Sequence, residues 1–210
     1  MKFILIASLT AVCFLNTTAQ TSIAVRGGFN YSTARAYYSD GKQPVGFVPG
    51  GNIGLQVNTV FEGLLHFSPF VGYNSRGFII KSKTNGDKTQ NFIHYIDIAA
   101  LLSIHKPMGG NNSFAITAGP VLSLAIAGTE KTTIAGISNS SKMKFSTSGD
   151  YGPFDFGLQA AVGYHFKKIF VEAAYQYGFV NINNNEEHDK RNIRNRTISL
   201  NLGYYIRSYK

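Results

Sequence analysis

Strict alternation of side chains over residues 154–166 constrains this chain more than any other feature of its sequence. Every second residue is apolar or aromatic and every residue between is small or polar: Phe154, Phe156, Leu158, Ala160, Val162, Tyr164 and Phe166 against Asp155, Gly157, Gln159, Ala161, Gly163 and His165. Neighbouring side chains separate in this way only in a β-strand, where they point to opposite faces. The alternation resumes after Lys168 and continues to Phe179. We predict a long β-hairpin over 154–180, with one face suited to contact with lipid or with a protein core.

Residues 1–19 have the composition of a secretory signal peptide. Lys2 supplies a positive charge, the apolar run 3–15 is too short to cross a bilayer and remain there, and small residues precede Gln20. Cys13 does not mark a lipoprotein, because the apolar run continues past it. A retained helical anchor is the alternative. We expect a signal peptide over 1–19 and a single domain over 20–210, with no cysteine in the mature chain.

The same alternation recurs along the chain and predicts eight strands in all. They cover residues 22–31, 51–60, 64–80, 92–105, 113–127, the two halves of 154–180, and 196–207. Pro69 lies inside the third strand and lacks a backbone donor, which predicts a bulge or a gap in pairing there. Residues 92–105 are nearly continuously apolar and fit a buried helix about as well. We prefer a strand because Ile96 and Ile98 share one face and Asp97 lies on the other.

The connections between these segments alternate in length. Those after the first, third, fifth and seventh strands are long, polar and basic, whereas the others are short turns. No run of about eighteen apolar residues remains after residue 19, so a transmembrane helix is not expected. Long and short connections at opposite ends are typical of outer-membrane barrels with both termini in the periplasm. We therefore predict an all-β fold, an eight-stranded antiparallel up-and-down transmembrane β-barrel of the outer membrane.

The chemistry of the non-apolar face indicates that it lines the interior of the barrel. Only 15% of all residues are charged, against about 25% in an average soluble domain. Buried charges need partners, so the isolated charges of this face are predicted to form a structural network in the lumen, with Arg26 opposite Glu172: Arg26, Asp97, Asp155 and Glu172. An eight-stranded lumen is only wide enough for side chains, and we expect no open diffusion porin. A soluble exported lipocalin-like barrel that carries a small apolar ligand is the alternative.

Several segments resemble one known family over essentially the whole mature chain. They are VRGGFNYS (25–32), SRGF (75–78), AGPVLSLAIAGT (118–129), FDFGLQAAVGYHF (154–166), AYQYGFVNI (174–182) and SLNLGYYI (199–206). With these loose Gly and aromatic patterns the chain resembles the PorT-like outer-membrane β-barrel family of gram-negative bacteria, and the resemblance implies an eight-stranded barrel. Such chains often end on an aromatic residue, whereas this one ends on Ser208, Tyr209 and Lys210.

No catalytic or cofactor motif accompanies this fold. The five histidines lie on different strands and connections, and no Ser–His–acid spacing can be read from them: His66, His94, His105, His165 and His188. We expect no enzyme activity, no cofactor and no metal site. The run Glu186-Glu187-His188-Asp189 is the alternative, as a ligand set for a divalent cation, although adjacent residues of one loop rarely converge on one ion.

Basic residues concentrate in the long connections and account for the net charge of +9. They include Lys81, Lys83, Lys88, Lys131, Lys142, Lys144, Lys190, Arg191 and Arg194. At the outer rim of a barrel these side chains would face the anionic phosphates of lipopolysaccharide, which explains the excess without nucleic acid. The expected partners are therefore outer-membrane lipid and lipopolysaccharide, together with an envelope protein that contacts the long loops. The predicted role is structural, or an interaction through those loops.

Overall fold

The computed structural model describes residues 21–38, 41–82, 86–146, 149, 151–184 and 190–207. The expected signal peptide, residues 1–19, lies outside these ranges. Within them no helix is long and apolar enough to cross a membrane. The described residues form twelve strands: β1 (Thr21–Tyr38), β2 (Gly41–Lys42), β3 (Val45–Glu62), β4 (Leu65–Phe67), β5 (Phe70–Lys81), β6 (Lys88–Ala99), β7 (Leu102–Pro107), β8 (Asn112–Ile134), β9 (Ile137–Lys142), β10 (Phe154–Phe166), β11 (Ile169–Gly178) and β12 (Asn192–Arg207).

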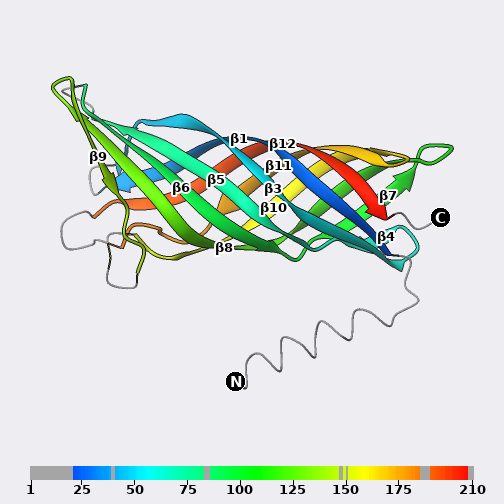
Figure 1. The fold of residues 1–210 in the computed structure, drawn as a ribbon. Coiled ribbons are helices and arrows are strands. Elements are labelled where there is room, and N and C mark those ends of the chain that lie inside the picture. The colour runs from blue at the N-terminus through cyan, green and yellow to red at the C-terminus, as the bar shows by residue number, and fades with distance from the viewer. Residues whose placement is uncertain are drawn as a thin grey trace, which may run out of the picture.

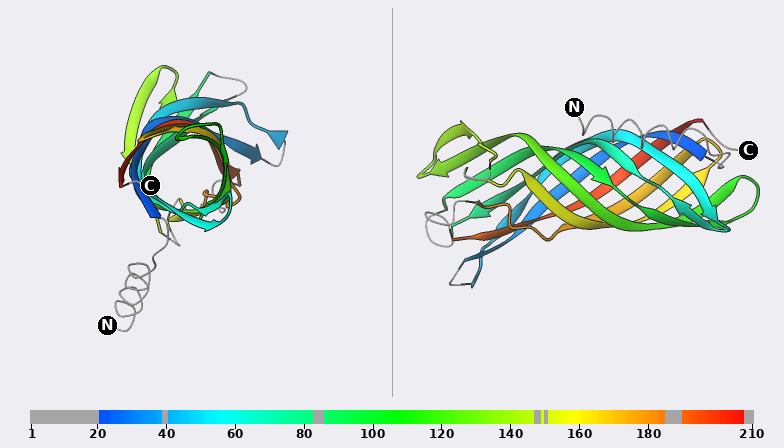
Figure 2. Two further views of the ribbon diagram at one scale, coloured as in Figure 1. Left: turned by 90° about the vertical axis from the view of Figure 1, so that its right-hand side faces the viewer. Right: turned by 90° about the horizontal axis from the view of Figure 1, so that it is seen from below.

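The long strands pair in an order that returns to its starting point. Antiparallel pairing runs β1-β12-β11-β10-β8-β6-β5-β3, and β3 also pairs with β1 along residues 48–59. Each of these strands therefore has a hydrogen-bonded neighbour on both sides, and Figure 2 shows them as a ring when viewed end-on. The short strands β4 and β7 continue the same wall, because β4 pairs with β3 and β7 pairs with β8.

The structure has twelve strands where the sequence predicted eight, because two predicted strands are interrupted and two predicted loops contain short strands. The predicted strand 64–80 divides into β4 and β5 at Pro69, and 92–105 divides into β6 and β7 at Leu101. The two interruptions face each other: the amide of Ser68 donates to the carbonyl of Leu101 over 2.7 Å. The predicted loops 32–50 and 128–153 contain β2 and β9. Their polar sequences conceal strands, because backbone pairing does not require an apolar face.

The two ends of the ring differ in the length of their hairpins. At one end β8 and β9 form a long hairpin that turns at Ala135 (φ 48°) and Gly136 (φ 84°), and β9 is exposed along its whole length. Two residues with positive φ make the type I′ turn that matches strand twist. At the other end lie β4, β7, the first residues of β1 and the last residues of β12 (Figure 1).

Burial divides most of the long strands into two chemically different faces, although residues 74–78 of β5 are all buried. Along β10 the exposed residues are Phe154, Phe156 and Leu158, whereas Asp155 and Gln159 are buried. The same holds around the ring: the buried set is rich in Asn, Ser, Gln and charged residues, and the exposed set is rich in Ile, Leu, Phe and Tyr. Soluble proteins rarely expose contiguous apolar surface of this extent. The predicted separation of faces is therefore confirmed over residues 154–163, whereas Tyr164, His165 and Phe166 are all half-buried.

Close backbone approach explains one glycine of the inner face. Gly28 of β1 pairs with Asn201 of β12 on one side and with Asn52 of β3 on the other. A Cβ atom at Gly28 would lie 2.2 Å from the carbonyl oxygen of Leu200 and 2.7 Å from the Cα atom of Asn201. Both are backbone atoms of a paired strand, so no side-chain rotation can make room.

We predict that Gly28→Ala destabilises the folded protein, whereas Gly51→Ala has a small effect. Overpacking against a fixed backbone costs about 1–3 kcal/mol, while a Cβ atom at Gly51 would have its nearest neighbour at 3.4 Å. Thermal unfolding of both variants in detergent micelles measures the difference. Equal unfolding midpoints for the two variants would contradict the explanation.

Candidate functional site

A buried ion pair joins two of the charges that the sequence singled out. Nη1 of Arg26 on β1 and Oε1 of Glu172 on β11 lie 3.1 Å apart, and both side chains are about 4% exposed. Arg26 Nη1 also donates to Oε1 of Gln56 over 3.2 Å, and its guanidinium lies 3.8 Å from the centre of the Phe70 ring. Strand β12 lies between β1 and β11, so the two side chains meet on the inner side of β12. Asn201 of β12 also donates to Glu172.

A second buried ion pair contains an arginine that sequence reasoning left out of the network. Nη2 of Arg76 on β5 donates to Oδ1 of Asp97 on β6 and, over 2.7 Å, to the hydroxyl of Ser123 on β8. The Arg76 guanidinium lies 4.3 Å from the centre of the Tyr95 ring. Arg76 has the same parity as Asn74 on β5, which places both on the inner face. This inward-facing position in the sequence could have identified Arg76 as the partner of Asp97, because a buried aspartate requires a partner.

Asp155 lies apart from both ion pairs. Its Oδ2 accepts a hydrogen bond of 2.9 Å from Asn195 Nδ2, which also donates to the hydroxyl of Tyr95. Its Oδ1 has no hydrogen-bond partner among the described residues. Of the four charges predicted for the lumen, the structure thus places Arg26 with Glu172, Asp97 with Arg76, and Asp155 with an amide.

A chain of asparagine side chains connects the two ion pairs along the inner face of the ring. From Glu172 it passes through Asn201, Asn52, Asn30 and Asn74 to Asp97, with donor–acceptor distances between 2.6 and 3.1 Å. An amide suits this position because it can donate and accept at once. Single deletions in such a network leave buried polar groups without partners, so the chain helps to hold together the six consecutive strands from β11 through β12, β1, β3 and β5 to β6.

Three histidines form a stack near the end of the ring that carries β4 and β7. The ring centres of His66 and His105 lie 4.1 Å apart, and those of His105 and His165 lie 4.7 Å apart. His165 Nδ1 forms a hydrogen bond of 2.8 Å with the hydroxyl of Tyr205, and its ring also stacks on Phe170. Sequence reasoning treated these histidines as scattered, because the strands that carry them are distant along the chain.

The described residues offer no group of three or more His, Cys, Asp or Glu side chains arranged to hold a metal ion. The rings of His66 and His105 stack, whereas the ring of His165 is tilted by 57° relative to that of His105. The alternative cation site, Glu186 to Asp189, contains residues 186–189, which lie outside the described part of the chain.

A basic cluster lies on the outer wall, beyond the apolar band at the end of the ring with the long hairpins. We call Arg35, Arg194 and Arg196 the outer arginine cluster. Arg35 of β1 pairs directly with Arg194 of β12 and donates from Nε to the hydroxyl of Tyr37. Arg196 pairs with Tyr177 of β11, and its guanidinium lies 5.1 Å from the centre of that ring.

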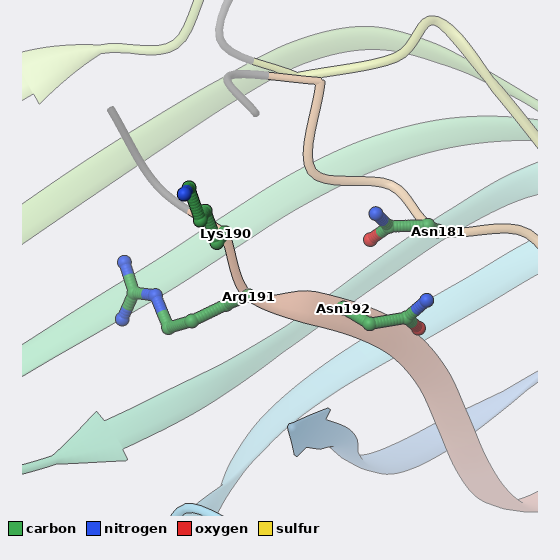
Figure 3. Close-up of a pocket in the computed structure, with 4 residues that line it drawn as sticks. All are labelled: Asn181, Lys190, Arg191 and Asn192. Carbon is green, nitrogen blue, oxygen red and sulfur yellow. The ribbon is translucent and has the colours of Figure 1, made fainter. Parts of the chain in front are cut away.

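Two adjacent concavities open beside this cluster. One of about 310 Å³ is lined by Arg35, Tyr37, Asn192 and Arg194. The other, of about 340 Å³, is lined by Asn181, Lys190, Arg191 and Asn192 (Figure 3). The two share Asn192, and none of the described residues that line them is a carboxylate. Arginine and lysine side chains around such concavities favour anionic ligands.

Comparison with known proteins identifies one matching family and several solved structures that resemble this chain. Residues 18–184 match the family described as outer membrane protein beta-barrel domain. Among solved structures, Ail, the attachment invasion locus protein of Yersinia pestis, is 15% identical, with 90% of this chain and 100% of that chain covered and a TM-score of 0.43. OprG from Pseudomonas aeruginosa is 13% identical, with 90% and 98% covered and a TM-score of 0.48. Neisserial surface protein A is 13% identical, with 88% and 97% covered and a TM-score of 0.41. No curated protein matches the sequence.

We predict that Arg26→Met destabilises the protein more than the double variant Arg26→Met/Glu172→Leu does. The single change leaves a carboxylate buried without its cation, a loss on the order of 3–5 kcal/mol, whereas removing both charges is often near neutral. Urea unfolding in lipid vesicles measures the free energies. If the double variant lost as much stability as the sum of both single variants, the ion pair would carry no coupling.

Proposed function

Because the chain belongs to the family of outer membrane protein beta-barrel domains, we propose that it is an integral outer-membrane protein whose long strands close into one eight-stranded transmembrane barrel. The observation that carries this proposal is the inversion of its two faces, with apolar residues exposed and polar residues buried. The return of the strand pairing from β3 to β1 supports closure. The Gly and aromatic segments, such as 154–166, support a place among PorT-like members. The family does not favour the soluble lipocalin-like alternative.

The lumen of this barrel is filled by side chains and is not an open pore. Two ion pairs and the asparagine chain lie in the interior, and the three histidine rings occupy the end near β4 and β7. A conduit for solutes would require these buried partners to separate. Separation is unfavourable because it leaves buried polar and charged groups without hydrogen-bond partners. The role is therefore structural, or an interaction through the outer loops, rather than catalysis or diffusion.

Both termini lie in the periplasm, and the long hairpins extend to the cell exterior. The short turns and the ends of β1 and β12 share one end of the ring, and the exposed β8–β9 hairpin occupies the other, the arrangement usual in outer-membrane barrels. The basic residues of the long connections, including Lys131, Lys142 and Lys144, face the phosphates of lipopolysaccharide or an envelope protein there.

Liposome swelling and gel migration test the closed, filled barrel. Proteoliposomes loaded with sugars should swell no faster than empty liposomes, because the interior side chains leave no water channel. The unheated protein should migrate differently from the boiled protein on a denaturing gel, as intact barrels do. Swelling at a porin-like rate, or migration that heating does not change, would refute the proposal.

Single cysteines test the orientation, since Cys13 is the only cysteine of the sequence. Ser140→Cys lies in the exposed β9 strand, and Asn111→Cys lies in the exposed turn between β7 and β8. On intact cells a membrane-impermeant maleimide should label Ser140→Cys alone, and permeabilised cells should add Asn111→Cys. The reverse pattern would place the termini outside the cell.

A further inference from the structure

The outer arginine cluster places like charges together without an obvious structural reason. Arg35 and Arg194 are direct cross-strand partners, and Arg196 follows on the same outward face of β12. Like charges directly opposite each other on paired strands destabilise the sheet. Lys42, on the neighbouring strand β2, pairs with Tyr37 of β1 and adds to the positive charge of this wall.

The described part of the chain supplies no carboxylate to offset this charge. Its two ion pairs, Arg26–Glu172 and Arg76–Asp97, both lie in the interior. The polar partners of the cluster are instead neutral: Arg35 donates to the Tyr37 hydroxyl, and Arg194 Nε donates to the side-chain oxygen of Asn192 over 3.1 Å. These contacts orient the guanidinium groups but leave their charge uncompensated.

The wall next to the cluster is apolar and aromatic. One step along the same face, two residues from Arg196, Ile198 of β12 pairs with Tyr31 of β1 and with Tyr175 of β11. Tyr31 stacks on Phe47 with ring centres 4.5 Å apart, and all four side chains are exposed. Two residues along a strand correspond to about 6.6 Å. The cationic layer therefore lies directly beside a surface that fits hydrocarbon chains.

We propose that the outer arginine cluster, with Tyr37 and Asn192, binds the phosphorylated sugar headgroup of a lipopolysaccharide molecule whose acyl chains lie against Tyr31, Phe47 and Ile198. The proposal rests on the proposed function, because it requires this end of the barrel to lie in the outer leaflet. An arginine fork binds phosphate through paired charge-assisted hydrogen bonds, which lysine cannot reproduce. A free anion would use the charge but leave the apolar wall uncovered. A phosphorylated lipid uses both.

The concavities strengthen the assignment to a bulky headgroup. Two hollows that share Asn192, with arginine or lysine in each lining, can accept two anionic groups carried by one ligand. The second hollow adds Lys190 and Arg191, whose side chains extend from the segment that leads into β12 (Figure 3). This site differs from general attraction by the loop lysines, because it is built on paired strands and lies beside the apolar band.

Lipopolysaccharide binding by the full-length mature protein in detergent micelles tests the site. The variant Arg35→Gln/Arg194→Gln/Arg196→Gln removes three positive charges, and Lys106→Gln/Lys167→Gln/Lys168→Gln removes the same number from the opposite end of the ring, where β7 and the turn between β10 and β11 lie. We expect the arginine variant to bind at least about tenfold more weakly, from the loss of several charge-assisted hydrogen bonds, and the lysine variant to lose much less. Equal weakening of both variants, or none in the arginine variant, would overturn the site.

Two further arms identify the ligand. Lipopolysaccharide with its phosphates removed should bind the native protein as weakly as intact lipopolysaccharide binds the arginine variant. Inorganic phosphate at millimolar concentration should not displace lipopolysaccharide; full displacement would indicate a simple anion site and overturn the lipid assignment.

Folding controls separate this inference from the proposed function. Each variant should show the heat-modifiable migration of the native barrel. If the native protein itself lacked it, the proposed function would fail regardless of lipid binding. In detergent without lipopolysaccharide, Arg194→Gln alone should unfold at a temperature no lower than that of the native protein, because it removes a like-charge pair. A clearly lower midpoint would assign Arg194 a structural role and overturn its place in the site.

Discussion

Backbone hydrogen bonding is the constraint on which the rest of this structure depends. A strand that faces hydrocarbon has no water to satisfy its amides and carbonyls, so every pairing position needs a protein partner. The pairing of β1 with both β12 and β3 meets that need at the two strands that a linear sheet would leave as edges. Where Pro69 interrupts the wall, the amide of Ser68 donates to the carbonyl of Leu101 instead. Even the irregular positions therefore keep their backbone groups paired.

This arrangement reverses the usual places of apolar and polar residues, and the reversal determines the interior. Polar side chains that point inward are removed from bulk water, so each needs a partner within the ring. The asparagine chain from Glu172 to Asp97 is one solution, since each amide links two neighbours. Gly28 and the small residues of the same face make room for these side chains. The interior thus contributes cohesion between neighbouring strands of the ring.

The outer wall carries the features that point beyond the fold. Most of its described surface is apolar and suits acyl chains, yet at one end Arg35 and Arg194 are held opposite each other. The interior arginines Arg26 and Arg76 have acidic partners. Arg35 and Arg194 instead donate to a hydroxyl group and a side-chain amide, respectively, among the described residues. This difference between the interior and the outer arginines supports the proposal that the outer arginines bind an external anion.

The local pattern of the sequence determined the approximate positions of the long strands and the two faces of each, because side-chain alternation has a period of two and needs no knowledge of neighbours. It also sufficed to place Arg26 near Glu172, two isolated opposite charges on one face. Only the tertiary structure decided the register between strands. Register is set by partners distant along the chain, and it alone brings Arg76 to Asp97, stacks His66 on His105, and sets Arg35 against Arg194. The strands β2 and β9 were not predicted for the same reason. Their polar sequences pair through the backbone, and a local sequence pattern does not identify the pairing partner.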